Sequence, residues 1–175
     1  MTSFIIKAHE NRELAQSWIQ HQECVFCRII KGDGPAFKVF ENEKVIAILD
    51  ILPLRAGHTL VIPKTHIARV SELPTEYAAA VGEAITKVSH ALTQALANTG
   101  LNVVCNQEYA QAVSHVHYHI IPAPDFSKPP VDEFNGSRVT AALTQKEMHK
   151  LEFESRGELD TDDANNLIQK IRARL

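Results

Sequence analysis

Hydrophobic and polar residues alternate most regularly along the chain between His115 and Pro122. This alternation has the period of a β-strand whose two faces meet different surroundings. Side chains two residues apart on a strand share a face and lie about 6.6 Å apart along it. We therefore expect His115, His117 and His119 to form a row on one face of a strand, with apolar side chains on the other face.

Four further segments have the pattern of strands. Residues 37–41 and 45–50 are separated by a short polar connection and predict a hairpin. Residues 58–63 predict a third, largely buried strand, and residues 101–106 predict a fourth. Together with the strand over residues 115–122, these segments predict a five-stranded antiparallel sheet.

The clearest helix pattern covers residues 75–98, where apolar side chains recur at spacings of three and four. Thr75 is the expected N-cap and Gly100 the expected C-cap. Shorter helices are predicted at residues 11–20, from 144 to about 155, and from Asp160 or Thr161 onward. A sheet with one long helix on a face gives an α+β fold, to which a short N-terminal helix and C-terminal helices are added.

The length of 175 residues favours one central domain with a core of ordinary size. We expect residues 1–22 to form an N-terminal extension, 23–124 the domain and 125–175 a C-terminal helical extension. No apolar run approaches the roughly 18 residues of a membrane span, and the short apolar run near the N-terminus does not make a signal peptide. The odd cysteine count favours a reducing compartment. We therefore expect an intracellular protein, cytoplasmic with the nucleus left open.

Composition narrows the class of partner. The net charge of −3 provides no long-range attraction for a polyanion. We therefore expect neither a nucleic-acid polymer nor a membrane surface as a partner. A small phosphorylated ligand needs only local hydrogen-bond donors and stays compatible with this charge.

The histidine row admits three interpretations. Imidazoles are poor core residues, because each ring needs a partner for at least one nitrogen. The row is therefore a solvated strand face, a metal site, or a nucleophilic site in which the middle histidine attacks and its neighbours orient it.

Cys24 and Cys27 form a Cys-x-x-Cys pair, which suits a redox centre, half of a zinc site, or two buried thiols. A redox role usually comes with a βαβ context, which is missing here. Zinc needs two further ligands from distant parts of the chain, so spacing alone leaves the choice open.

The pattern His-x-His-x-His followed by two apolar residues resembles the signature of the histidine-triad (HIT) family of nucleotide hydrolases and transferases. Further landmarks in the family's order are the Cys-x-x-Cys pair, Asp50-Ile51, residues 57–66, Asn106 and residues 111–113. The resemblance covers roughly residues 24–122. It implies the α+β fold described above and a homodimer paired through the long helix and the strand that follows it.

The resemblance also implies nucleotidyl transfer, with an AMP-like purine nucleotide as substrate or product. His117 would attack the α-phosphorus of a phosphoramidate or phosphoanhydride and form a nucleotidyl-histidine intermediate. His119 and Asn106 would donate to the phosphoryl oxygens, together with backbone N–H groups near Gln111 and Ala112.

Three more roles follow from the same resemblance. His58 would orient His119 or His117, and Asp50 would hold the ribose hydroxyls. Apolar side chains would line a slot for the base: Phe26, Ile29, Ile48, Ile51 and Leu60.

A zinc site is implied as well, because the Cys-x-x-Cys branch of the family, which includes the Hint-type nucleoside phosphoramidases, keeps a fixed ligand set. Here that set is Cys24, Cys27, His66 and His115. Four nitrogen and sulfur ligands leave no open position, so Zn²⁺ would be structural and His117 would stay free to react.

Ala112 departs from the family pattern. Many members carry a hydroxyl residue at this position, which contacts the phosphate and assists the leaving group. Alanine cannot do so, which puts the rate and the leaving-group preference in doubt. An alternative function is therefore a nucleotide sensor or partner-binding adaptor with vestigial hydrolysis.

Overall fold

The structure is a computed structural model that describes residues 23–124, 147, 150, 153–154 and 156–175. The expected helix at residues 11–20 lies outside these ranges, as does most of the helix expected from 144 to about 155.

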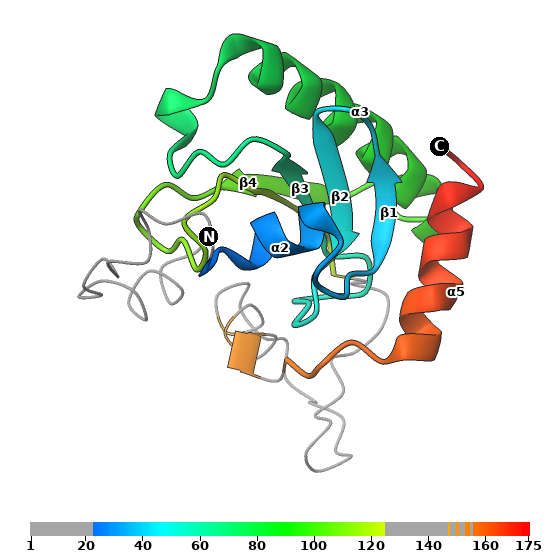
Figure 1. Cartoon of the computed structure of the whole chain (residues 1–175). Coiled ribbons are helices and arrows are strands. Elements are labelled where there is room, and N and C mark those ends of the chain that lie inside the picture. Colours follow the sequence, from blue (N-terminus) through cyan, green and yellow to red (C-terminus); the bar gives the residue numbers. More distant parts are fainter. Residues whose placement is uncertain (1–22, 125–146, 148–149, 151–152, 155) are drawn as a thin grey trace.

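The described residues form an α+β fold around one antiparallel sheet with the strand order β1-β2-β3-β5-β4 (Figure 1). The strands are β1 (Lys38–Glu41), β2 (Val45–Leu49), β3 (Thr59–Pro63), β4 (Leu101–Cys105) and β5 (Tyr118–Pro122). The helices are α2 (Val25–Lys31), the 3-10 helix η3 (Val70–Glu72), α3 (Thr75–Leu96) and α5 (Thr161–Arg172). The predicted five-stranded sheet with one long helix is confirmed.

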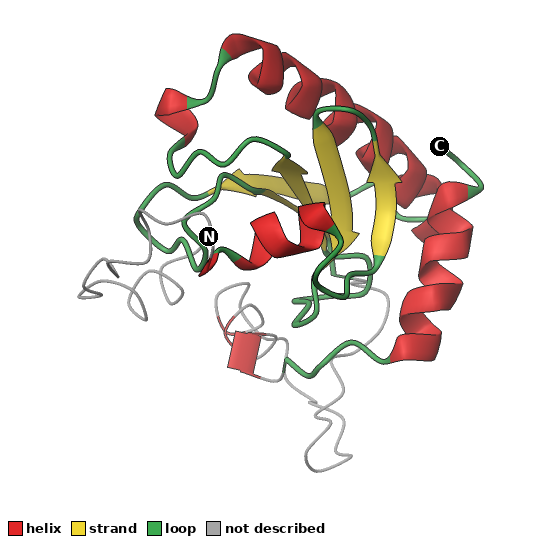
Figure 2. Ribbon diagram, in the orientation of Figure 1, coloured by secondary structure: helices red, strands yellow, loops and turns green. Residues whose placement is uncertain are grey.

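Helices cover both faces of the sheet (Figure 2), and β2 shows how the sequence specifies this arrangement. Alternate residues of a strand point to opposite faces. Val45, Ala47 and Leu49 pack in the cluster that includes α3 and α5, whereas Ile46 and Ile48 pack in the cluster that includes α2. Fully burying an aliphatic side chain stabilises a fold by about 1.5–3 kcal/mol. The five buried residues of β2 therefore make this strand a stable part of the core.

The last helix, α5, folds back on the domain, where it packs against α3 and β1. Its buried residues Ala164, Ile168 and Ile171 recur at spacings of four and three, the period of one face of a helix. Asp160 caps the helix, since its carboxylate accepts from the backbone N–H groups of Asp162 and Asp163.

The predicted caps of the long helix are wrong. Pro74 is the N-cap of α3, so Thr75 is already its first helical residue, and the C-cap is Ala97, with a left-handed φ of 50°. Gly100 has a different reason to be glycine, because a Cβ there would lie 2.6 Å from the Cβ of Ala123.

The predicted histidine strand is right only in its second half, because β5 begins at Tyr118. Before that point the backbone finds another partner: the N–H of Val116 donates to the carbonyl of Ile67 over 2.8 Å. His115 and His117 therefore lie in an irregular segment. His119 lies in the strand, opposite Leu60, and so faces the α2 side of the sheet.

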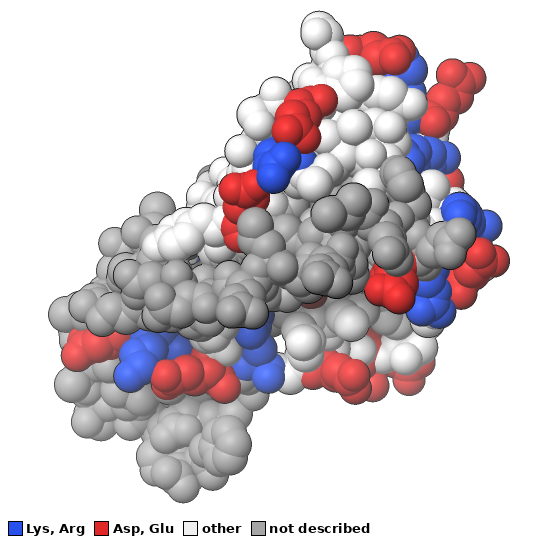
Figure 3. All heavy atoms as spheres, turned by 60° about the vertical axis from the view of Figure 1, so that its left-hand side comes forward, with Lys and Arg blue, Asp and Glu red and all other residues white. Residues whose placement is uncertain are grey.

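The surface matches the charge balance of the sequence. On the face drawn in Figure 3, acidic and basic side chains of the described residues are interspersed and form no continuous basic area. Within the described residues, no helix is long and apolar enough to cross a membrane.

Candidate functional site

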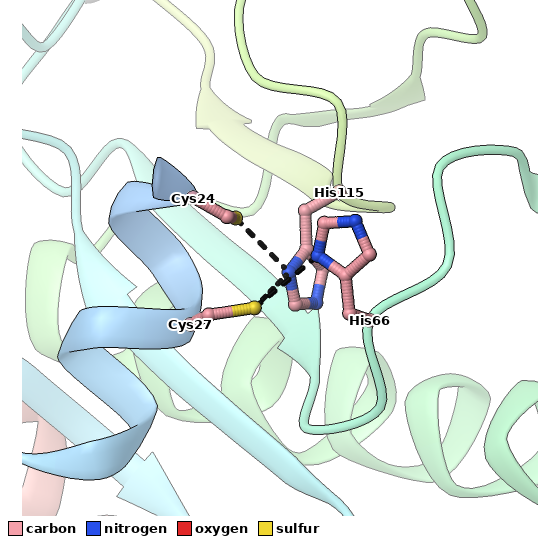
Figure 4. Close-up of side chains that lie close together, drawn as sticks. All are labelled: Cys24, Cys27, His66 and His115. Atoms are coloured by element: carbon pink, nitrogen blue, oxygen red, sulfur yellow. Dashed lines mark hydrogen bonds between the residues drawn. The ribbon is translucent and has the colours of Figure 1, made fainter. Parts of the chain in front are cut away.

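The first half of the site is a cluster of two thiols and two imidazoles, Cys24, Cys27, His66 and His115 (Figure 4). Cys24 precedes α2 and Cys27 lies within it, while His66 follows β3. One ligand atom from each residue lies within 4.8 Å of all the others. Residues from three distant parts of the chain therefore converge on one point.

The distances inside this cluster match a tetrahedral metal site. The Nδ1 atom of His115 lies 3.5 Å from the Sγ atom of Cys24 and 3.6 Å from that of Cys27, and the Nδ1 atom of His66 lies 3.2 Å from the Cys27 sulfur. Zinc bond lengths of about 2.3 Å to sulfur and 2.0 Å to nitrogen give a sulfur–nitrogen edge of about 3.5 Å in a tetrahedron. These three sulfur–nitrogen distances therefore suit a zinc ion held by the cluster.

The surroundings favour a cation as well. The Nε2 atom of His115 donates to the carbonyl of Pro63 over 2.8 Å, which leaves Nδ1 unprotonated and aimed at the two sulfurs. Burial and the neighbouring Cys24 raise the pKa of the Cys27 thiol to about 11. Two buried thiolates would repel each other without a cation between them, and a metal removes that penalty.

The second half of the site begins at His117, whose side chain is 3% exposed. Its Nδ1 atom lies 2.6 Å from the backbone carbonyl of His115. A carbonyl oxygen only accepts, so Nδ1 carries the ring proton and Nε2 holds a lone pair. Burial lowers the pKa of His117, although the hydrogen bond to His115 acts in the opposite direction. The ring is therefore neutral at pH 7.

A chain of hydrogen bonds fixes the tautomers of the two neighbouring rings. The backbone N–H of Leu54 donates to Nδ1 of His58 over 3.1 Å, so the proton of the His58 ring is on Nε2. That Nε2 atom lies 2.9 Å from Nδ1 of His119 and donates to it. The remaining nitrogen of His119, Nε2, must then carry a proton that it can donate. The ring centroids of His117 and His119 are 5.0 Å apart, so the two rings are direct neighbours.

Burial lowers the pKa of both His58 and His119, in the case of His58 to about 3. Asp50 completes this group, with a carboxylate oxygen 3.5 Å from Nδ1 of His58. Asp50, His58 and His119 also lie close enough to share an ion. Their facing nitrogens are already hydrogen-bonded and none offers sulfur, so the cysteine cluster is the better metal centre.

The loop between β4 and β5 is braced by the buried side chain of Gln111. Its amide oxygen accepts from the N–H of Glu108 over 2.7 Å and its amide nitrogen donates to the carbonyl of Ala68 over 3.0 Å. Glu108 and Ala110 adopt left-handed φ angles of 58° and 57°. The side chain of Gln111 thus shapes a strained loop, a role that the sequence does not reveal.

The other predicted contact residues divide into three groups. Ala112 is exposed in this loop, and Asn106 directly follows β4, whose last residue pairs with Tyr118. Apolar residues predicted for the base slot pack in one cluster under α2: Phe26, Ile29, Ile48 and Leu60. Ile51 stands apart from them, with 57% of its surface exposed. Phe26 touches the triad, its ring centroid 5.1 Å from that of His117.

Comparison with known proteins identifies this arrangement. The family model described as "HIT domain" matches residues 31–125. The chain is 46% identical over 103 residues to Protein hit of Bacillus subtilis, covering 58% of this chain and 71% of the relative. It is 39% identical over 111 residues to adenosine 5'-monophosphoramidase HNT1 of Candida albicans, covering 60% and 73%. It is also 38% identical over 102 residues to adenylylsulfatase HINT3 of Arabidopsis thaliana, covering 57% and 52%.

Among solved structures, a Zn-bound histidine triad family protein from Mycobacterium smegmatis superposes with a TM-score of 0.57. That protein is 33% identical to this chain, and the match covers 77% of this chain and 94% of the other.

Proposed function

This chain belongs to the HIT family, and on that premise we propose that it is a nucleotide-binding hydrolase or transferase that acts through a nucleotidyl-histidine intermediate. The bond that it cleaves is a phosphoramidate or phosphoanhydride at the α-phosphate of an AMP-like nucleotide. The observation that carries the proposal is the hydrogen bond of 2.6 Å between Nδ1 of His117 and the His115 carbonyl, which leaves a lone pair on Nε2. The relatives at 38% and 39% identity are named adenylylsulfatase and adenosine 5'-monophosphoramidase, and these names support an adenylyl-type substrate.

In the first step, Nε2 of His117 forms a bond to the α-phosphorus while the bond from phosphorus to the leaving group breaks. The leaving nitrogen or oxygen takes up a proton from solvent, and the water that attacks in the second step returns one. In the second step, water attacks the same phosphorus, the bond to Nε2 breaks, and a nucleoside monophosphate leaves with the neutral His117 regenerated. Each step is an in-line displacement that needs donors around the phosphoryl oxygens.

His119 is the proposed donor, since the hydrogen-bond chain through His58 leaves its Nε2 proton available. His58 holds that ring in place and does not touch the substrate. Asn106 and the backbone N–H groups at Gln111 and Ala112 are proposed as further phosphate donors, and Asp50 as the acceptor for the ribose hydroxyls. The apolar cluster under α2 is proposed to line the base slot.

Zn²⁺ is proposed at Cys24, Cys27, His66 and His115, where it would supply a closed structural link between α2, the segment after β3 and the segment before β5. The sulfur–nitrogen distances near 3.5 Å and the second hydrogen bond of His115 support this assignment. The carbonyl of His115 then fixes the tautomer of His117.

A turnover assay tests the proposal. Wild type should release AMP from adenosine 5'-phosphoramidate and from a diadenosine polyphosphate, while His117→Ala should not. Equal background rates for the two proteins would refute the enzyme and favour the sensor or adaptor. Ala112→Ser separates a slow enzyme from an inactive one, because restoring the hydroxyl should raise kcat only if the His117 chemistry operates.

A further inference from the structure

The proposed nucleotide site lacks positive charge of its own. Nε2 of His58 donates to Nδ1 of His119 over 2.9 Å, and Nδ1 of His58 accepts from the N–H of Leu54, so these two rings are neutral tautomers. Asp50 adds a carboxylate. A nucleotide brings at least one negative charge, so a cation beside the triad would strengthen its binding beyond what neutral donors provide.

Two arginines supply this charge. Burial is the main cause of the low pKa of His58, and the positive charges of Arg156 and Arg55 lower it further. Arg156 also acts on Asp50. Burial raises the pKa of Asp50 overall, and the hydrogen bond from the N–H of Leu52 and the charge of Arg156 each reduce this rise. Both arginines therefore lie within electrostatic reach of the site.

Arg156 lies in the C-terminal segment that precedes α5 (Figure 1 shows this segment in orange), and one contact fixes the path of the segment. The N–H of Leu159 donates to the carbonyl of Ile51 over 2.9 Å, directly after Asp50. Leu159 also packs against the main core. Because this hydrogen bond joins residues more than 100 positions apart in the sequence, it fixes the path of the segment beside the site.

The two guanidinium groups differ in how they are held. Nη1 of Arg55 donates to the carbonyl of Pro122 over 3.0 Å, which ties this group to the end of β5. Arg156 is held by two contacts with Phe153. Its Nε donates to the Phe153 carbonyl over 3.2 Å, and its Cζ lies 3.9 Å from the centroid of the Phe153 ring. Within the described residues, its Nη groups make no hydrogen bond. A pre-positioned guanidinium with open Nη donors suits bidentate binding of phosphate or sulfate.

We propose that Arg156 recognises a second anionic group of the nucleotide, a phosphate or sulfate beyond the α-phosphate. This inference rests on the proposed function. The second anionic group can stand at one of two positions. It is either attached to the α-phosphate at the 5' end, where it is the leaving group, or attached to the ribose. Asp50 would repel a phosphate on the ribose that it is proposed to hold, so the 5' chain is the expected source. The chain would then prefer anionic leaving groups over a neutral amine.

Equilibrium binding to the full-length chain tests this role, in a His117→Ala background that prevents turnover. The ligands are AMP, ADP and adenosine 3',5'-bisphosphate. Arg156→Gln should weaken ADP binding by about tenfold or more, as expected for a lost hydrogen bond between charged groups. Binding of AMP should change less than about twofold, and Arg156→Lys should recover part of the loss. The matched control is Arg174→Gln, at an exposed arginine two residues past the end of α5.

If Arg156→Gln weakened only the binding of the bisphosphate, Arg156 would still bind an anion, but that anion would be a phosphate on the ribose. Equal weakening of AMP and ADP binding, or no change in either, would overturn the proposal. It would also be overturned if the His117→Ala protein with Arg156 intact bound none of the three ligands. If the ADP effect appears in the His117→Ala background while the protein with His117 intact turns over no substrate, the proposed reaction fails and the role of Arg156 stands.

Discussion

His115 and His117 are two positions apart, yet the structure gives their rings opposite surroundings. His115 presents Nδ1 to two sulfur atoms and donates Nε2–H to the Pro63 carbonyl. His117 donates Nδ1–H to the carbonyl of His115 and keeps the lone pair on Nε2. The hydrogen-bond partner of the second nitrogen therefore decides whether an imidazole is suited to ligate a metal or to attack phosphorus.

Removing the proposed nucleophile should give the largest effect and should affect only one of the two histidines' roles. His117→Ala should lower kcat by at least about 10⁴-fold, since the covalent step has no substitute. Zinc content should stay at the wild-type level, because no ligand is lost. Steady-state kinetics and metal analysis on the same preparation check both statements. A variant that lost zinc together with activity would show that the two halves are not separate.

Removing a metal ligand should give the opposite pattern. Cys27→Ser should release the metal and lower the free energy of unfolding by about 4 kcal/mol in buffer containing zinc at 1,000 times the Kd of the site. Denaturant unfolding with and without a chelator measures the loss. Wild-type protein that holds fewer than about 0.2 zinc ions per chain when purified without chelator would contradict the assignment.

A smaller loss of activity is expected from changing His58, which positions His119. His58→Ala should lower kcat by about 10²-fold, because His119 loses the donor that fixes its tautomer and position. KM should change little. His58→Gln keeps a donor and should recover part of the rate, which a purely structural role would not predict.

The pH dependence should be the mildest signal. His58 has a pKa near 3 in the folded protein and near 6.5 when unfolded, so between these values the unfolded chain binds more protons. The free energy of unfolding should therefore be full above about pH 6.5 and decline as the pH falls toward 3. In the same way, kcat should persist below pH 6.5, because burial lowers the pKa of His117. A kcat that halves near the ordinary histidine pKa of about 6.5 would place a solvated ring at the reaction centre.

Much of the fold was predictable, because α3 has a clear helical period and β2 is a short continuous apolar run. The start of β5 was not, since the alternation continues to His115 although the ladder does not. Helix α2 escaped prediction because its seven residues are too few to show a helical period. In the site, the triad and the Cys-x-x-Cys pair were visible as motifs. The bracing by Gln111 and the approach of Arg156 were not, because both depend on contacts between distant segments.

The stereochemical course at the α-phosphorus tests the central claim most directly, and it does not require the intermediate to accumulate. A substrate made chiral at phosphorus with sulfur and an oxygen isotope reports whether the configuration inverts once or twice. Attack by His117 followed by attack of water is two in-line displacements, so we predict net retention of configuration. Net inversion would mean that water attacks the substrate directly, and would contradict the role of His117 as nucleophile.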